Sequence, residues 1–88
     1  MVEEYLLKKI GEYIPQARIQ EISDKIDNAN NTSKVAPLLT ELQNINNKIY
    51  EDFGLTDTVL DFQCWINGLR NLYDIPDEAE LDGEDFVQ

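Results

Sequence analysis

Carboxylates are the side chains of this chain best suited to chemistry, and they crowd toward its C-terminal end. Residues 74–88 hold seven of the eighteen acids and neither Lys nor Arg. Apolar residues between these acids could anchor in a pocket of a partner protein, while the carboxylates pair with Lys or Arg there. The alternative is a solvated segment that binds nothing. The candidate binding residues in this stretch are Asp74, Asp77, Glu78, Glu80, Leu81, Asp82, Glu84, Asp85 and Phe86.

The same segment has part of the spacing of a calcium-binding loop. The acids at 78, 80 and 82 and the following Gly83 match the first half of such a loop. Its first residue, however, is Glu where a shorter acid is expected, and the bidentate acid that closes the loop would fall after Gln88. We therefore expect no metal site here, and no metal or other cofactor elsewhere in the chain.

Catalytic groups are scarce in this sequence. It contains no histidine, which removes the usual general acid–base at neutral pH and the commonest metal ligand. Cys64 could act as a nucleophile only beside an activating base or a positive charge. The residues one helical turn away, Leu60, Asp61 and Gly68, offer neither. Paired carboxylates could cleave a glycoside in a sizeable cleft, but a thin helical core leaves little room for one. We expect a protein that is not an enzyme.

The overall charge indicates the kind of partner. The net charge is −11, and residues 1–73 carry eleven acids against seven bases. Such a surface repels nucleic-acid phosphates and anionic lipid, which bind to clustered Lys and Arg. We expect an electropositive protein partner and no direct contact with nucleic acid or membrane. The alternative is that the acids merely keep the protein in solution.

Length and cysteine content set the broad class. A chain of 88 residues fits one domain, and no apolar run approaches the ~18 residues that span a bilayer. The first residues, Met1–Glu4, are acidic where a secretory signal would be basic. A lone cysteine forms no internal disulfide, so we expect a cytoplasmic protein.

Apolar residues recur at steps of three and four along most of the chain, which is the spacing of one face of a helix. We expect helices over about residues 2–14 and 16–29, a third that begins near Ser33, and a fourth that begins within 56–58. Pro37 is tolerated only in a first helical turn, and Gly54 suits a left-handed helix end. The third and fourth helices are expected to bury Val35, Leu38, Leu42, Ile45, Ile49 and Phe53, and Leu55, Val59, Phe62, Ile66, Leu69 and Tyr73.

Four amphipathic helices with short connections pack most simply as an all-α, four-helix bundle. We assign this bundle to residues 1–75, with the third and fourth helices as an antiparallel hairpin. Residues 76–88 form an acidic C-terminal tail, and segments of this composition often stay flexible until they bind.

Leu60, Cys64 and Gly68 form a smooth second strip on the fourth helix, away from its main apolar stripe. We favour packing of the first helix against this strip, and the alternative is contact with a second copy in a homodimer. Trp65 flanks the main stripe and could be core or an interface anchor. Asn46 falls within the apolar arc of the third helix, and we expect it at the wet edge, because a buried amide must be paired.

The function that these features favour is binding without catalysis. We expect an inhibitor or accessory protein that docks on a basic surface, with Trp65 and the tail as contacts. One such surface would be a nucleic-acid-binding site, where the acids would imitate phosphates. Short, acidic, histidine-free helical chains of this kind are typical of small accessory proteins of mobile elements. The alternative is a homo-oligomerisation module in which Leu60, Cys64 and Gly68 make the contact and the tail only keeps the protein in solution.

Overall fold

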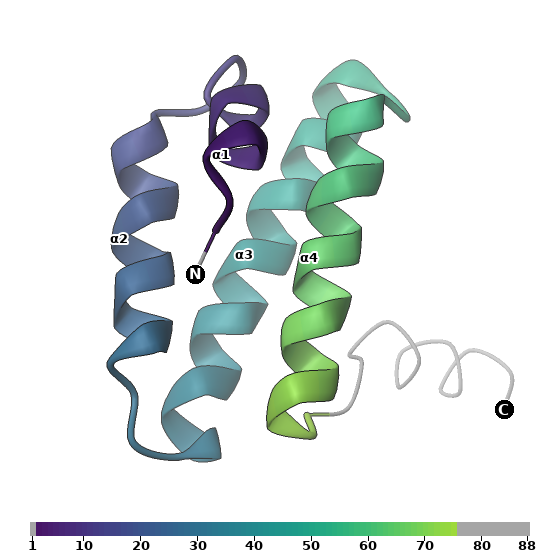
Figure 1. Cartoon of the computed structure of the whole chain (residues 1–88). Coiled ribbons are helices and arrows are strands. Elements are labelled where there is room, and N and C mark those ends of the chain that lie inside the picture. The colour runs from purple at the N-terminus through teal and green to yellow at the C-terminus, as the bar shows by residue number, and fades with distance from the viewer. Residues whose placement is uncertain (1, 76–88) are drawn as a thin grey trace, which may run out of the picture.

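The structure, a computed structural model, describes residues 2–75 as an all-α bundle (Figure 1). No strand occurs within that range. This architecture confirms the predicted fold class. The four helices are α1 (Glu4–Ile10), α2 (Gln16–Asp27), α3 (Thr32–Phe53) and α4 (Asp57–Tyr73).

The two longest helices, α3 and α4, form the expected antiparallel hairpin, and α2 lies along the other side of α3 (Figure 1). The shortest helix, α1, packs against both α2 and α4. Each of the four helices therefore contacts two others, and a single apolar core can run through all of them.

Isoleucine and leucine side chains make up most of this core. Phe62 is its largest fully buried residue. Full burial of a side chain of this size stabilises the fold by roughly 1.5–3 kcal/mol relative to exposure. The buried apolar residues are Val2, Leu6, Ile10, Ile19, Ile22, Ile26, Val35, Leu39, Leu42, Ile45, Ile49, Val59, Phe62, Ile66 and Leu69.

Four of the residues predicted to be buried are not, and one of them, Tyr73 at the end of α4, is partly buried. Phe53 and Leu55 are 58% and 68% exposed, because they flank the Gly54 turn, where the hairpin runs past the core. Leu38 is only half-buried, and its neighbour Leu39 is buried instead. Because α3 contacts helices on two sides, its buried arc is rotated and wider than a single stripe.

The helix starts and ends agree with the prediction at the hairpin turn but not at the start of α3. Gly54 has a positive φ of 83°, and the Thr56 side chain accepts the Val59 N–H at 3.2 Å, as an N-cap does. At the other end of α3, the N-cap is Asn31 rather than Ser33. The earlier start places Pro37 inside the helix, where it gives up one backbone hydrogen bond.

The first two helices are shorter than predicted. Backbone hydrogen bonds from the N–H groups of Gly11 and Tyr13 to the carbonyls of Leu7 and Ile10, both at 2.9 Å, close α1 into a turn ahead of Pro15. At Asn28, α2 ends in the same way, because the Asn28 N–H donates a 3.0 Å hydrogen bond to the Asp24 carbonyl. Short, polar Asn side chains compete for backbone partners and favour this ending.

Asn46 was expected at a wet edge, and this expectation is wrong, since the residue is 2% exposed. Its Nδ2 donates to the Val59 carbonyl and to Gln63 Oε1, both at 3.2 Å, so pairing across the hairpin offsets the burial of the amide nitrogen, while Oδ1 has no hydrogen-bond partner among the described residues. Beside it, the Gln43 and Gln63 amides exchange two hydrogen bonds of 2.7 Å. Arg70 Nη1 donates to Gln43 Oε1 at 3.1 Å. This polar seam lets α3 and α4 meet in one register.

Candidate partner-binding surface

Most of the predicted binding residues of the tail lie outside the described part of the chain. Within it, Asp74 is exposed and ends α4 in a left-handed conformation, with φ 57° and ψ 47°. Its backbone N–H bonds back to the carbonyls of Arg70 and Asn71. Asp74 therefore has a structural role as a helix end as well as a charge. The residues outside the description are Asp77, Glu78, Glu80, Leu81, Asp82, Glu84, Asp85 and Phe86.

Trp65 lines a surface pocket between α1 and α4 with a volume of about 420 Å³. The indole is half-buried, and its ring centroid lies 6.0 Å from that of the core residue Phe62. Trp65 thus combines the two roles considered for it, because it packs on the core while also lining a surface pocket. We call this site the Trp65 pocket. Its lining residues are Glu3, Tyr5, Leu6, Asp61, Cys64 and Trp65.

Two polar contacts join α1 to its neighbours beside this pocket, while buried apolar side chains hold the helix in place. At its start, the Val2 N–H donates to the buried Ser23 hydroxyl of α2 at 3.1 Å. At its end, Lys9 Nζ donates to Asp61 Oδ2 of α4 at 2.8 Å. Leu6 and Ile10 of the same helix are buried in the core. The short helix is therefore positioned mainly by tertiary contacts, since helices of this length are marginal alone.

The ammonium of Lys9 shows what the pocket edge can bind. It contacts Asp61, donates to the Tyr5 hydroxyl at 3.0 Å and lies 4.9 Å from the centroid of the Tyr5 ring. The hydrogen bonds to Asp61 and then to Tyr5 raise the pKa of Lys9 above the usual lysine value. A carboxylate, a phenol and an aromatic face thus already bind one cation here.

The Trp65 pocket keeps an excess of negative charge. Glu3 is exposed, and no ion pair among the described residues involves it. Asp61 keeps 43% of its side chain exposed while it binds Lys9. A carboxylate has acceptor sites on both oxygens, so Asp61 can accept from a second donor. The pocket and its edge thus hold two carboxylates against one ammonium.

Elsewhere on the described surface the ion pairs are long and exposed. Arg18 lies 3.7 Å from Glu41 and Lys25 lies 3.4 Å from Glu21, while Lys48 and Asp52 are 3.3 Å apart. Exposed pairs of this kind stabilise a fold by only ~0–1 kcal/mol. They neutralise part of the acidic surface and leave several exposed acids without an ion pair among residues 2–75, namely Glu3, Glu4, Glu12, Asp24, Glu51 and Asp57.

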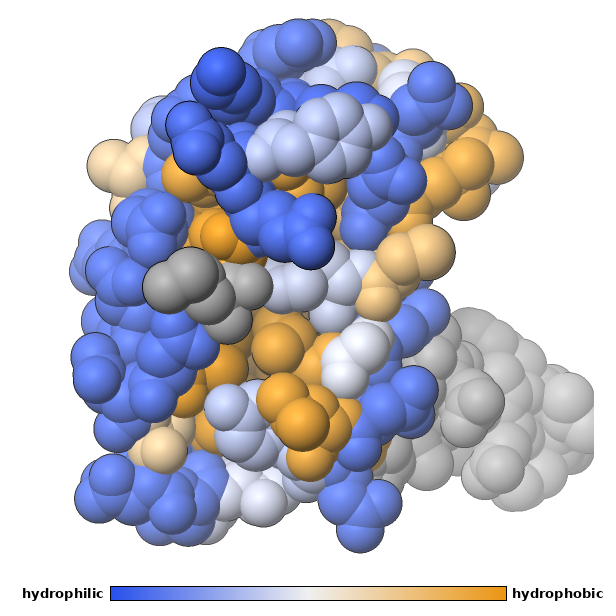
Figure 2. Space-filling model, viewed as in Figure 1, coloured by the Kyte–Doolittle hydropathy of each residue, from blue (hydrophilic) through white to orange (hydrophobic). Residues whose placement is uncertain are grey.

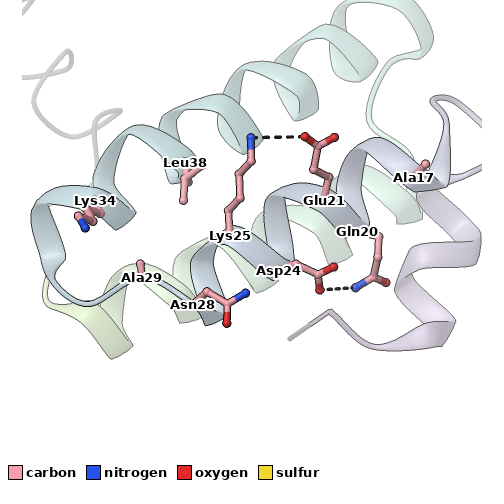
Figure 3. Close-up of a pocket in the computed structure, with 9 residues that line it drawn as sticks. All are labelled: Ala17, Gln20, Glu21, Asp24, Lys25, Asn28, Ala29, Lys34 and Leu38. Atoms are coloured by element: carbon pink, nitrogen blue, oxygen red, sulfur yellow. Dashed lines mark hydrogen bonds and ion pairs between the residues drawn. The ribbon is translucent and has the colours of Figure 1, made fainter.

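A larger groove, of about 660 Å³, lies between α2 and α3 (Figure 3). Four of its polar residues bind one another in pairs: Lys25 pairs with Glu21, and Gln20 donates to Asp24 at 2.9 Å. The groove brings no aromatic residue next to its charges. Despite its size, it is therefore a weaker candidate than the Trp65 pocket, in which polar and aromatic groups converge.

The strip of Leu60, Cys64 and Gly68 on α4 is uncovered, which contradicts the favoured prediction that α1 packs on it. Leu60 is 51% exposed, the Cys64 thiol is free and exposed, and a Cβ added at Gly68 would meet nothing within 4 Å. Leu72 extends the line by one more turn and is 73% exposed. Instead, α1 packs on the neighbouring side of α4, near Asp61.

A second apolar surface lies at the turn of the hairpin, and it includes two residues that were predicted to be buried, Phe53 and Leu55. Tyr50, Phe53 and Leu55 are each more than half exposed, and the Tyr13 ring packs against that of Phe53 in a tilted arrangement, with centroids 4.7 Å apart and an interplanar angle of 60°. Figure 2 shows apolar surface reaching the exterior at the upper right edge and in the middle of this face, with hydrophilic residues around both. The position of Phe53 next to Gly54 was the available signal, because a helix end beside a turn is often beyond the core.

Comparison of the chain with protein-family models, with curated proteins and with solved structures returned no match. Among residues 2–75, no cluster of three or more His, Cys, Asp or Glu side chains could hold a metal ion. None of the helices described is long and apolar enough to span a membrane.

Proposed function

We propose that this protein is a non-enzymatic binding module that docks on an electropositive surface of a partner protein and acts there as an inhibitor or accessory protein. The observation that carries the proposal is the Trp65 pocket, where carboxylates lie beside two aromatic rings. Interface anchors are typically aromatic and apolar groups, with charged groups around them that match the partner.

The charge of the chain supports the same mode of binding. A net charge of −11 steers a basic partner toward the protein and repels acidic ones. The tail, residues 76–88, contributes six acids; Leu81 lies between them in sequence and Phe86 directly follows the last of them. We propose that the tail adds a second, salt-sensitive contact to the same partner.

A basic surface on the partner could be one that binds nucleic acid. In that case the carboxylates would take the place of phosphates, and the protein would compete with DNA or RNA for the partner. We propose a cytoplasmic setting, because the lone Cys64 is a free thiol. The absence of histidine from the chain supports a role without acid–base catalysis.

Salt and charge reversal test this proposal. The partner is captured from an extract of the native cell with the full chain, purified and measured by calorimetry at several salt concentrations. Affinity should fall steeply as salt rises, and reversal of Glu78, Glu80 and Asp82 to Lys should abolish binding. The matched control reverses Glu21, Glu41 and Asp52, which already have intramolecular partners. Binding that is insensitive to salt contradicts the proposal.

Self-association is the second candidate, and the uncovered strip on α4 favours it. Leu60, Cys64, Gly68 and Leu72 follow one another at steps of four residues. In an antiparallel pair of α4 helices related by a two-fold axis, Leu60 faces Leu72 of the second copy, and Cys64 faces its Gly68.

Sedimentation separates the two candidates. A dimer of two acidic chains should become tighter as salt screens their repulsion, whereas docking on a basic partner should weaken. Cys64→Arg should convert the dimer to a monomer. A wild-type chain that stays monomeric at high protein and salt concentrations eliminates the second candidate.

A further inference from the structure

The Trp65 pocket has features of a receptor for a cationic side chain. It is open to solvent between two helices, its walls include Tyr5 and Trp65, and its polar groups are the carboxylates of Glu3 and Asp61. Aromatic faces attract cations through their electron-rich surfaces, and adjacent carboxylates add charge-assisted hydrogen bonds. These two kinds of group favour the same ligand class and disfavour an anion.

The protein itself provides an internal example of such a ligand. The Lys9 ammonium is held by Asp61, by the Tyr5 hydroxyl and over the Tyr5 ring. Its bond to Asp61 joins residues 52 positions apart, so it is a tertiary contact rather than a product of helix geometry. Lys9 uses Asp61 Oδ2, and the lining carboxylate of Glu3 has no ion pair among the described residues. The indole of Trp65 is also a wall of the pocket.

We infer that the Trp65 pocket binds the ammonium group of a lysine side chain presented by the basic partner, between Tyr5 and Trp65 and against Glu3 and Asp61. This inference rests on the proposed function and adds the chemical group that is recognised. Lys9 competes with the lysine of the partner for the Asp61 carboxylate, because both ammonium groups bind to it. Loss of the Lys9 charge should therefore strengthen binding, and loss of the Asp61 charge should weaken it.

Trp65 provides a direct readout, because it is the only tryptophan in the chain. The full-length protein is titrated with a capped, lysine-rich peptide, and both Trp65 emission and calorimetric heat are recorded. Emission should change in a saturable way. A peptide of the same sequence with acetylated lysines should leave the emission unchanged, because acetylation removes the charge. An arginine-rich peptide that binds as tightly would overturn the assignment to a lysine ammonium.

Two pairs of variants distinguish the effect of the pocket on binding from the effect of the net charge of the protein. Asp61→Asn should weaken binding about fivefold, the size expected for one solvent-exposed cation contact, and Asp24→Asn on α2 should change it by less than about twofold. Lys9→Met should tighten binding about threefold or more, since it frees Asp61. Lys8→Met makes the same change in net charge at an exposed neighbour and should have a smaller effect. Circular dichroism establishes that each variant is folded, and Glu3→Gln gives an independent loss at an exposed position.

The outcomes distinguish this inference from the proposed function. Equal effects within each variant pair, with no change in Trp65 emission, overturn the lysine pocket, even if calorimetry still finds salt-dependent binding of the peptide. That result would leave docking on a basic surface intact. Salt-insensitive binding of the captured partner would overturn the proposed function instead. A lysine-rich peptide that fails to bind at low salt overturns the pocket.

Discussion

The two sides of α4 differ in how they use their polar groups. Toward α3, the amides of Asn46, Gln43 and Gln63 bond one another across the seam, and Arg70 is buried with them. Toward α1, by contrast, the polar contact is one ion pair at the edge of an open pocket. Amides that bond across two packed helices favour one register, whereas an exposed ion pair can exchange its partner at low cost. The first side is therefore structural, and the second is suited to binding.

The largest effect should come from the core residue on which both sides depend. Phe62 is fully buried and lies against Trp65. Phe62→Ala should lower the free energy of unfolding by about 3–5 kcal/mol, because it leaves a cavity. Urea denaturation followed by circular dichroism measures this loss. A loss below ~1 kcal/mol would mean that the two sides do not share one core.

The polar seam should be the next most sensitive region. Asn46→Ala removes the donor to the Val59 carbonyl and to Gln63, and should destabilise the fold by about 1–3 kcal/mol. The matched control is Asn44→Ala, an exposed position on the same helix, which should change stability by less than ~0.5 kcal/mol. Equal denaturation midpoints for the two variants would show that the seam does not stabilise the hairpin.

A substitution at Gly68 tests the free face of α4 without disturbing the side that packs on α3 or the side that packs on α1. A Cβ at this position meets no atom within 4 Å, so Gly68→Ala should stabilise the monomer by up to ~1 kcal/mol through helix propensity. If α4 pairs with a second copy, the same methyl group should oppose Cys64 there and weaken the dimer. Thermal denaturation gives the first effect and sedimentation gives the second. Loss of monomer stability would contradict the open position of Gly68.

The smallest effect on stability is expected at the Lys9–Asp61 pair, which is partly exposed. Folding raises the pKa of Lys9, so the pair stabilises the fold fully below the ordinary lysine pKa of about 10.4 and loses its effect only as pH rises through the higher folded value. The stability difference between wild type and Lys9→Met should therefore be constant between about pH 6 and about pH 9, and should shrink in high salt. A difference that changes with pH in this window would mean that another titrating group controls the contact.

The spacing of apolar residues, together with the turn and capping residues between the helices, was enough to predict most of the fold. Steps of three and four gave four helices, and Gly54 with Thr56 gave the hairpin turn. The same reasoning failed at Phe53 and Leu55, because periodicity does not reveal where a helix extends beyond the core. It also failed at Asn46, since an amide inside an apolar arc is tolerated only when another helix offers it partners.

The candidate site was less predictable than the fold. Trp65 was identified as a potential anchor, but nothing in the sequence joins it to Glu3 and Tyr5, which lie 60 or more positions earlier. The Lys9–Asp61 contact spans 52 positions and brings these parts of the chain together. The strip on α4 was recognised from its spacing, yet its exposure depended on the side of α4 that α1 occupies.

The amino-acid sequence by itself determined the helices, the turn between α3 and α4 and the acidic character of the protein, because these depend on local geometry and on composition. Tertiary structure alone decided which polar residue is buried, which face of α4 stays free and which aromatic residues share a pocket with carboxylates. These properties arise from contacts between segments far apart in the chain, and local spacing does not encode them.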